Sequence, residues 1–152
     1  MVTVYARSTH PMQWSTQATA RTKARPEDVW RLWTDVAGWN RWDDDVQSSR
    51  LDGAFVAGAC GLLKPRRGPA ARFVLTHVEP CVAFTNRSKL PLATLEFVHV
   101  LAIDGGETVV THRVVMTGPL TFLFRRLVGT GIARGLPAAV ARLARAAEGP
   151  AA

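Results

Sequence analysis

The order of hydrophobic and polar positions predicts a strand, two short helices, several further strands and a final long helix. Residues 14–24 alternate between two sides, which is typical of a strand with one buried face. A short helix is then expected from Pro26-Glu-Asp, because proline suits the first helical turn and carboxylates stabilise its positive end. Gly38 is expected to interrupt it, and Trp39–Trp42 is predicted to form a second short helix or turn.

Residues 45–117 have the alternation of strands throughout, and glycine or proline marks the breaks between them. These predicted turns or bulges lie at Asp52-Gly53, Gly58, Gly61, Gly68-Pro69, Glu79-Pro80, Pro91 and Gly105-Gly106.

After Gly118-Pro119 the apolar residues recur with helical spacing, which predicts one amphipathic helix almost to the end of the chain. We expect Pro137 to kink this helix. Its glycines at 129, 131 and 135 each cost about 1 kcal/mol relative to alanine. They therefore indicate a need for space, a close approach to the sheet, or a break near Gly129.

This order of elements predicts an α+β domain in which a curved antiparallel sheet grips a long C-terminal helix. We assign residues 1–13 to an N-terminal extension, 14–147 to the domain and 148–152 to a C-terminal tail.

The chain resembles the START-like (SRPBCC) superfamily with the helix-grip fold, which includes polyketide cyclases, plant pathogenesis allergens and lipid-transfer domains. The resemblance implies a cavity between the sheet and the long helix, and it leaves the chemistry open because fold does not determine function. The motifs that carry it are Arg25–Trp30, Trp33–Trp42, Leu51–Gly53, Leu75–Pro80, Gly105–Thr108 with the strand that follows, and Gly118–Leu120.

The strand pattern also predicts which side chains face each other. A hairpin centred on Gly105-Gly106 sets His99 opposite His112, Phe97 opposite Val114, Leu95 opposite Met116 and Leu101 opposite Val110. A turn at Glu79-Pro80 would pair His77 with Val82, Leu75 with Phe84 and Phe73 with Asn86. A loop over 89–92 would pair Phe84 with Phe97 and Val82 with His99.

The predicted inner face is apolar except for a few polar groups, and it is the candidate ligand site. Three interpretations of the His99 and His112 pair stay open. The two rings share a hydrogen bond in the core, or they orient a ligand or exchange protons with it, or they bind a metal. Zinc usually takes three or four ligands, and no cysteine or carboxylate is predicted beside the pair, so we assign no metal. The predicted ligand-binding residues are Trp33, Trp39, Trp42, Phe73, Leu75, His77, Phe84, Asn86, Leu95, Phe97, Val110, Val114, Met116, Phe124 and Val128.

The hydrophobic content and the net charge of the chain limit the classes of function that we expect. The 152 residues are 47% hydrophobic, which suits one folded domain, and no apolar run is long enough to span a membrane. The net charge of +7 could attract nucleic acid, an anionic membrane surface or acidic substrates. However, 16 of the 19 basic residues are arginines spread along the chain, without the interleaved aromatics of nucleic-acid readers. We therefore expect a solvated basic surface and no nucleic-acid partner.

Other candidate sites are weaker. Asp43-Asp-Asp lacks the spacing of a calcium loop, so a solvated loop is expected. No dinucleotide or phosphate-loop motif is present, so no cofactor is expected. Two cysteines and a charged N-terminus predict a cytoplasmic protein with free thiols.

Three functions remain open from the sequence. The first is binding of an apolar lipid- or polyketide-like molecule, by a bacterial protein that is a monomer or homodimer. The second is a polyketide cyclase or aromatase that uses His99 and His112 as acid–base groups. The third is an interaction module without a ligand.

Overall fold

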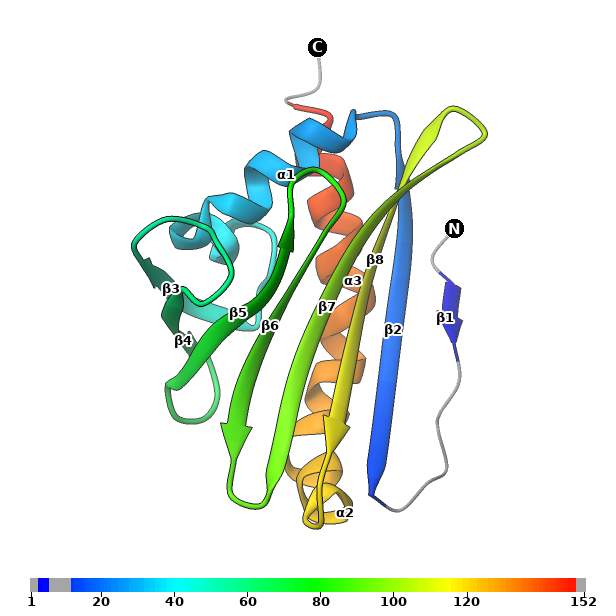
Figure 1. The fold of residues 1–152 in the computed structure, drawn as a ribbon. Helices are drawn as coiled ribbons and strands as arrows, with labels where there is room; N and C mark the ends of the chain where they lie inside the picture. Colours follow the sequence, from blue (N-terminus) through cyan, green and yellow to red (C-terminus); the bar gives the residue numbers. More distant parts are fainter. Residues whose placement is uncertain (1–2, 6–11, 150–152) are drawn as a thin grey trace.

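The computed structural model describes residues 3–5 and 12–149, and Figure 1 shows a curved sheet with a long helix behind it. These residues form one eight-stranded antiparallel sheet with the strand order β1-β2-β8-β7-β6-β5-β4-β3. The strands are β1 (Thr3–Tyr5), β2 (Gln13–Thr22), β3 (Val46–Asp52), β4 (Cys60–Pro65), β5 (Ala71–Glu79), β6 (Ala83–Leu90), β7 (Ala93–Asp104) and β8 (Glu107–Thr117). The helices are α1 (Pro26–Thr34), the 3-10 helix η1 (Val36–Arg41), α2 (Thr121–Phe124), the π-helix η2 (Arg125–Gly129) and α3 (Thr130–Ala147).

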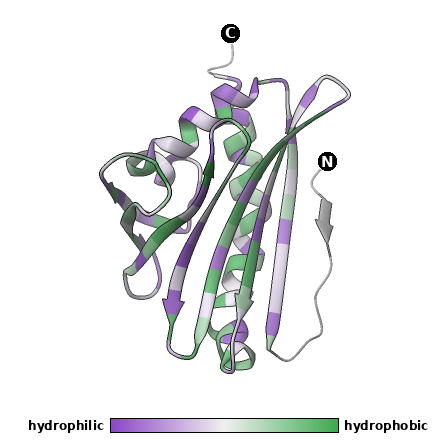
Figure 2. Ribbon diagram, in the orientation of Figure 1, coloured by the Kyte–Doolittle hydropathy of each residue, from purple (hydrophilic) through white to green (hydrophobic). Residues whose placement is uncertain are grey.

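The predicted fold class is confirmed, because two short helices follow β2 and the terminal helix packs against β2 and β8. Hydrophobic and hydrophilic positions succeed one another along the central strands and around α3 (Figure 2). The buried face that the alternation of residues 14–24 predicts is present in β2, where the small side chains of Ala18 and Ala20 are buried. Helix α1 begins at Pro26, and its first turn contains the expected carboxylates.

The chain before residue 14 contributes an element that the sequence pattern did not indicate. Strand β1 pairs with β2 at the edge of the sheet, with Thr3 opposite Thr19. A three-residue strand is too short to show alternation, so the pattern could not distinguish it from an extension.

The terminal helix is interrupted by the π-helical turn η2, and α3 then continues through Pro137 to Ala147. The close approach expected of its glycines occurs at two positions. A Cβ on Gly129 would lie 3.1 Å from the Trp14 ring, and a Cβ on Gly135 would clash with the Asp45 carboxylate. A larger side chain at Gly129 would require a small shift of the Trp14 ring, and one at Gly135 would require the exposed Asp45 side chain to turn away.

The predicted register of the β7–β8 hairpin is confirmed for every pair that the sequence indicated, including His99 opposite His112. The predicted β5–β6 register is wrong. Leu75 pairs with Asn86 and His77 with Thr85, so a bulge lies between Leu75 and His77. Periodicity does not reveal a bulge, because one extra residue on a single strand leaves each half of the alternation intact.

The predicted β6–β7 register is also wrong, although the same side chains of β6 and β7 face inward. Phe84 pairs with His99 and Asn86 with Phe97, because the connection is a two-residue turn at Pro91 and Leu92. The expected loop over 89–92 is therefore shorter, and each inward residue of β6 meets a partner two positions further along β7.

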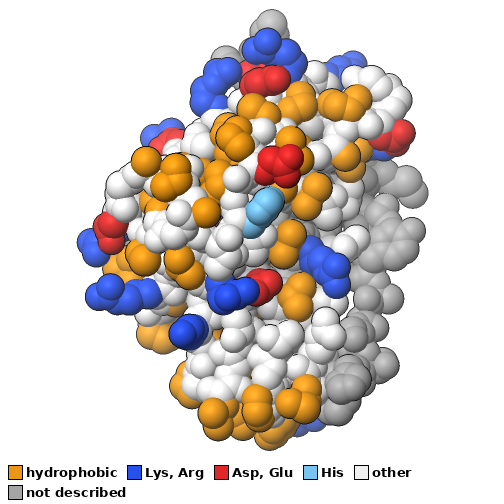
Figure 3. Space-filling view, in the orientation of Figure 1, with side chains coloured by type: hydrophobic (Ala, Val, Ile, Leu, Met, Phe, Trp, Pro, Cys, Tyr) orange, Lys and Arg blue, Asp and Glu red, His pale blue; other side chains and the backbone are white. Residues whose placement is uncertain are grey.

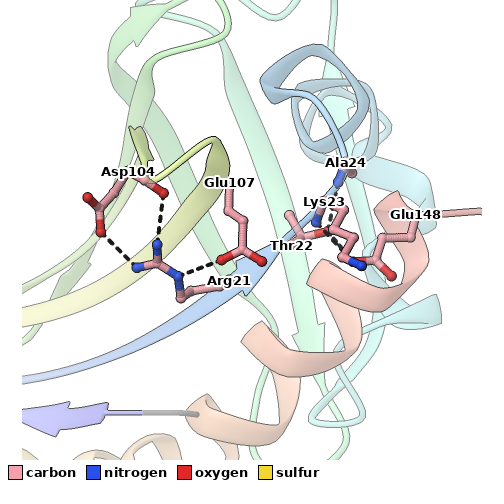
Figure 4. Close-up of polar contacts among 7 residues, drawn as sticks. All are labelled: Arg21, Thr22, Lys23, Ala24, Asp104, Glu107 and Glu148. Carbon is pink, nitrogen blue, oxygen red and sulfur yellow. Dashed lines mark hydrogen bonds and ion pairs between the residues drawn. The ribbon is translucent and has the colours of Figure 1, made fainter.

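Polar contacts hold the end of β2 against two other elements (Figure 4). The Oγ1 of buried Thr22 lies 2.9 Å from Glu148 Oε1, which joins the end of α3 to the end of β2. The Arg21 guanidinium binds Asp104 at 2.9 Å and Glu107 at 2.8 Å across the β7–β8 turn. Exposed ion pairs of this kind add little to stability, so they mainly fix the end of β2 beside the β7–β8 turn.

Candidate functional site

The two predicted catalytic residues lie side by side on the inner face of the sheet. His99 and His112 are 7% and 4% exposed, and their ring centroids are 4.5 Å apart in an edge-to-face arrangement. The sequence-based expectation of neighbouring inward imidazoles is thus confirmed as geometry.

Trp33 of α1 covers this pair. Its indole Nε1–H donates to His112 Nε2 over 3.2 Å, so a neutral His112 carries its proton on Nδ1. The Nδ1 of His99 lies 3.3 Å from the Phe84 carbonyl oxygen, which can only accept, so the His99 proton is also on Nδ1. The hydrogen bonds therefore fix one tautomer for each ring.

Burial keeps both rings neutral. It lowers the pKa of His99 to about 3, against a smaller opposing effect of backbone hydrogen bonds to Phe84 and Phe97. The pKa of His112 is lowered well below its ordinary value by burial and, to a lesser degree, by the neighbouring His99. A histidine with so low a pKa is not protonated near pH 7 and is a poor proton donor there.

Aromatic rings fill the space around the pair, so this end of the inner face is closed. Phe84 stacks on His99 with 3.9 Å between ring centroids, and the Trp42 ring lies 5.7 Å from His112. Trp39 stacks on Phe73 at 5.7 Å. Trp33, Trp39 and Trp42, which are among the predicted ligand-binding residues, are all buried in the core.

Most of the predicted ligand-binding residues belong to the same packed core. Their side chains contact one another, so their role as walls of a ligand site stays a prediction. The fully or almost fully buried members are Trp33, Trp39, Trp42, Phe73, Leu75, Phe84, Leu95, Val110, Val114 and Met116.

His77 does not join the inner face, contrary to the predicted row of His77, Val82, His99 and His112. Its side chain is 56% exposed and its Nε2 lies 3.8 Å from Glu79 Oε2. Val82 is also exposed. The bulge after Leu75 is the cause, because it turns His77 outward and leaves Val78 to pack against the core.

The inner face is less closed two residues further along β6. There Asn86 lies between Leu75 of β5 and Phe97 of β7. Asn86 is 5% exposed, and its Oδ1 has no hydrogen-bond partner among the residues that the structure describes. Phe97 remains partly exposed, as do Phe124 and Val128 of the terminal helical segment. A buried acceptor of this kind costs about 1–3 kcal/mol unless water or a ligand supplies a hydrogen.

Sequence reasoning identified Asn86 as the polar residue of the inner face of β6, but it missed a second group. The indole Nε1–H of Trp42 is likewise buried without a partner within the described part of the chain. Hydrophobic patterning classed Trp42 as an apolar wall, and a pattern cannot show whether an indole N–H finds an acceptor.

The loop of three aspartates is exposed to solvent at Asp44 and Asp45, as expected, whereas Asp43 is only partly exposed. The Asp43 carboxylate accepts the Asp45 N–H at 3.0 Å, and its partial burial raises its pKa to about 6. Asp44 forms an ion pair with Arg142 of α3. Across residues 3–5 and 12–149, no group of three or more His, Cys, Asp or Glu side chains is placed to hold a metal.

A hollow lies at the β6–β7 turn, outside the space between sheet and helix. It is an open depression of about 340 Å³, and its lining includes Lys89, Leu92 and Pro119. The enclosed cavity beneath the long helix therefore stays a prediction.

The fold and the composition of the inner face define a START-like domain of the helix-grip class. A family model described as polyketide cyclase / dehydrase and lipid transport matches residues 13–148, and the chain belongs to this family. No curated protein sequence matches the chain.

Solved structures share the fold at low sequence identity. TTHA0849 from Thermus thermophilus is 18% identical with a TM-score of 0.68, over 88% of this chain and 97% of that one. The di-domain ARO/CYC BexL from the BE-7585A biosynthetic pathway is 15% identical with a TM-score of 0.76, over 94% of this chain and 52% of BexL. The di-domain ARO/CYC StfQ from the steffimycin biosynthetic pathway is 12% identical with a TM-score of 0.74, over 91% and 51%. The chain thus spans about half of each di-domain protein.

Proposed function

We propose that the protein binds a small, mainly apolar molecule carrying a hydroxyl or similar donor, on the inner face of the sheet around Asn86. The buried Asn86 Oδ1 without a partner in the described structure is the observation that carries the proposal. The family description, which names polyketide and lipid chemistry, supports an apolar ligand of this size class.

The surroundings of Asn86 support the same ligand chemistry. Phe97 and Leu75 flank the amide, and of these two Phe97 is partly exposed. An apolar skeleton would gain by covering the exposed part of Phe97, at roughly 25 cal/mol per Å² of buried apolar surface. A donor on that skeleton would satisfy the amide oxygen and fix the orientation of the molecule.

A cyclase-type reaction with His99 and His112 as acid–base groups has less support. Both rings are neutral at pH 7, His112 Nε2 already accepts from Trp33, and aromatic side chains cover the pair. We assign the two histidines to the core that supports the site.

The test compares 2-naphthol with naphthalene, which differ by one hydroxyl group, by titration calorimetry and by fluorescence. We expect the wild type to bind 2-naphthol about fivefold more tightly than naphthalene, since a buried hydrogen bond contributes on the order of 1 kcal/mol. Asn86→Leu should remove this preference and retain binding of naphthalene.

The matched control is Ser88→Ala, because Ser88 is also buried and lies two residues further along the same strand. It should leave the preference for 2-naphthol intact. Equal preference in Asn86→Leu and wild type, or no binding of either compound, would contradict the proposal.

A further inference from the structure

Large apolar side chains are exposed together at one end of the molecule, where the β6–β7 turn meets α2. The lower edge of Figure 3 shows hydrophobic side chains gathered at this end. We call this surface the apolar tip, formed by Leu92 (68% exposed), Phe122 (54%), Leu123 (40%) and Leu127 (68%).

Backbone hydrogen bonds make the tip one structural unit. The Leu120 N–H donates to the Leu92 carbonyl at 3.1 Å, which fixes the start of α2 to the β6–β7 turn. Phe122 and Leu123 follow on α2, and Leu127 lies one helical turn beyond Leu123 on η2. The exposed side chains are therefore held on a shared support.

Leu92 occupies a backbone conformation that its residue type disfavours. It has φ of +53° at the second position of the Pro91-Leu92 turn, where glycine or asparagine is usual. A leucine there is both strained and exposed, so neither turn geometry nor the core explains it. Strain of this kind at a surface position is a feature of functional sites.

The charges around the tip are of one sign. Lys89 lies on the strand before the turn, and Arg125 and Arg126 lie within η2. No Asp or Glu occurs in residues 80–95 or in residues 108–147. Lys89 and Leu92 also line the open depression of about 340 Å³, which places a cation beside an apolar group at the edge of a hollow.

We propose that the apolar tip docks on the surface of an anionic lipid bilayer. The four apolar side chains would enter the interfacial region, and Lys89, Arg125 and Arg126 would bind lipid phosphates. None of the described helices is long and apolar enough to span a membrane, so the proposed contact is peripheral. This docking does not depend on the ligand proposed at Asn86.

The test is co-sedimentation of the full chain with vesicles of phosphatidylcholine alone or of phosphatidylcholine and phosphatidylglycerol in equal parts. We expect binding to the mixed vesicles, weaker binding to the neutral ones, and a decrease with added salt. Leu92→Asn with Leu127→Ser should lower partitioning at least about tenfold, since two leucines leave the interface. Lys89→Glu with Arg126→Glu should lower it at least about twentyfold, since each cation near an anionic surface contributes about fivefold.

Matched controls separate the tip from general surface properties. Ile103→Ser with Val56→Ser removes two exposed apolar side chains elsewhere, and Arg50→Glu with Arg72→Glu makes the same change in net charge on β3 and β5. Both controls should bind the mixed vesicles more tightly than the tip variants, and Asn86→Leu should bind them as the wild type does. All substitutions lie at exposed positions except Asn86→Leu, and thermal unfolding checks that each variant is folded.

Three results would overturn the proposal. One is no binding of the wild type to the mixed vesicles, and another is an equal loss in the tip variants and their controls. The third is self-association that depends on Leu92 and Leu127, measured by sedimentation equilibrium, without vesicle binding. That result would assign the tip to contact with a second copy of the chain.

Discussion

Large apolar side chains are buried at one end of the domain and exposed at the other. At the closed end, Trp33, Phe84 and the two histidines are buried against one another, and the polar ring atoms Trp33 Nε1, His112 Nε2 and His99 Nδ1 have partners. At the apolar tip, Leu92 and Leu127 are each 68% exposed. The difference indicates that the closed end provides stability, whereas the tip contributes little to it and is free to contact another surface.

Among these substitutions, Trp33→Ala should lower the free energy of unfolding most, because it disrupts the packing at the closed end. It removes a fully buried indole and its hydrogen bond to His112. We expect a loss of about 3–5 kcal/mol in the free energy of unfolding, measured by urea denaturation. Trp33→Phe should lose less because an aromatic ring remains, and a loss below about 1 kcal/mol for Trp33→Ala would contradict a packed closed end.

The buried histidines should make the protein less stable in mild acid. Burial lowers the pKa of His99 from 6.5 to about 3, so below pH 6.5 the unfolded chain binds the proton more readily than the folded chain. The stability that depends on neutral His99 is therefore lost as pH falls, by up to about 1.4 kcal/mol per pH unit, and His112 acts in the same direction.

Urea midpoints between pH 7 and pH 4.5 measure this loss. His99→Gln with His112→Gln should flatten the dependence on pH. His77→Gln, at the exposed position beyond the bulge, serves as the control and should keep the slope of the wild type. An unchanged slope in the double variant would show that the pair is not buried as described.

Asp43→Asn should stabilise the protein at pH 7. Burial raises the pKa of Asp43 from 3.8 to about 6, so the folded chain binds the proton more readily between these values. The contribution of Asp43 to stability therefore decreases as pH rises from 3.8 to about 6. Asparagine carries no charge and so avoids this loss, and its side-chain oxygen can still accept the Asp45 N–H. We expect a gain of about 1–3 kcal/mol at pH 7 by urea denaturation. Asp52→Asn, at an exposed position, should change little, and a loss of stability in Asp43→Asn would contradict this account.

Substitutions at the tip should have the smallest effect on stability. Leu92→Asn should change the free energy of unfolding by no more than about 1 kcal/mol, with a gain favoured because asparagine tolerates the left-handed conformation. Leu127→Ser should stay within about 0.5 kcal/mol, measured in the same urea experiment. A loss above about 2 kcal/mol at either position would show that the tip is part of the core.

The sequence alone determined the fold class and one complete hairpin. Alternation around Gly105-Gly106 placed His99 opposite His112, because a two-residue turn leaves one register that buries one face. It also indicated Asn86 as an inward polar residue, since a shift of two residues in β6–β7 keeps the same face inward.

The surroundings of these residues, including their burial and hydrogen bonds, are determined by the tertiary structure alone. A bulge of one residue turned His77 outward. Trp33 of α1 fixed the tautomer of His112, the Phe84 carbonyl fixed that of His99, and burial lowered the pKa of both rings. Local patterns record which side of an element is apolar, but burial and hydrogen bonding depend on the segment that packs against that side. For the same reason, the helical spacing of apolar residues after Gly118-Pro119 did not show that Leu127, which lies in the π-helical turn, is exposed at the tip.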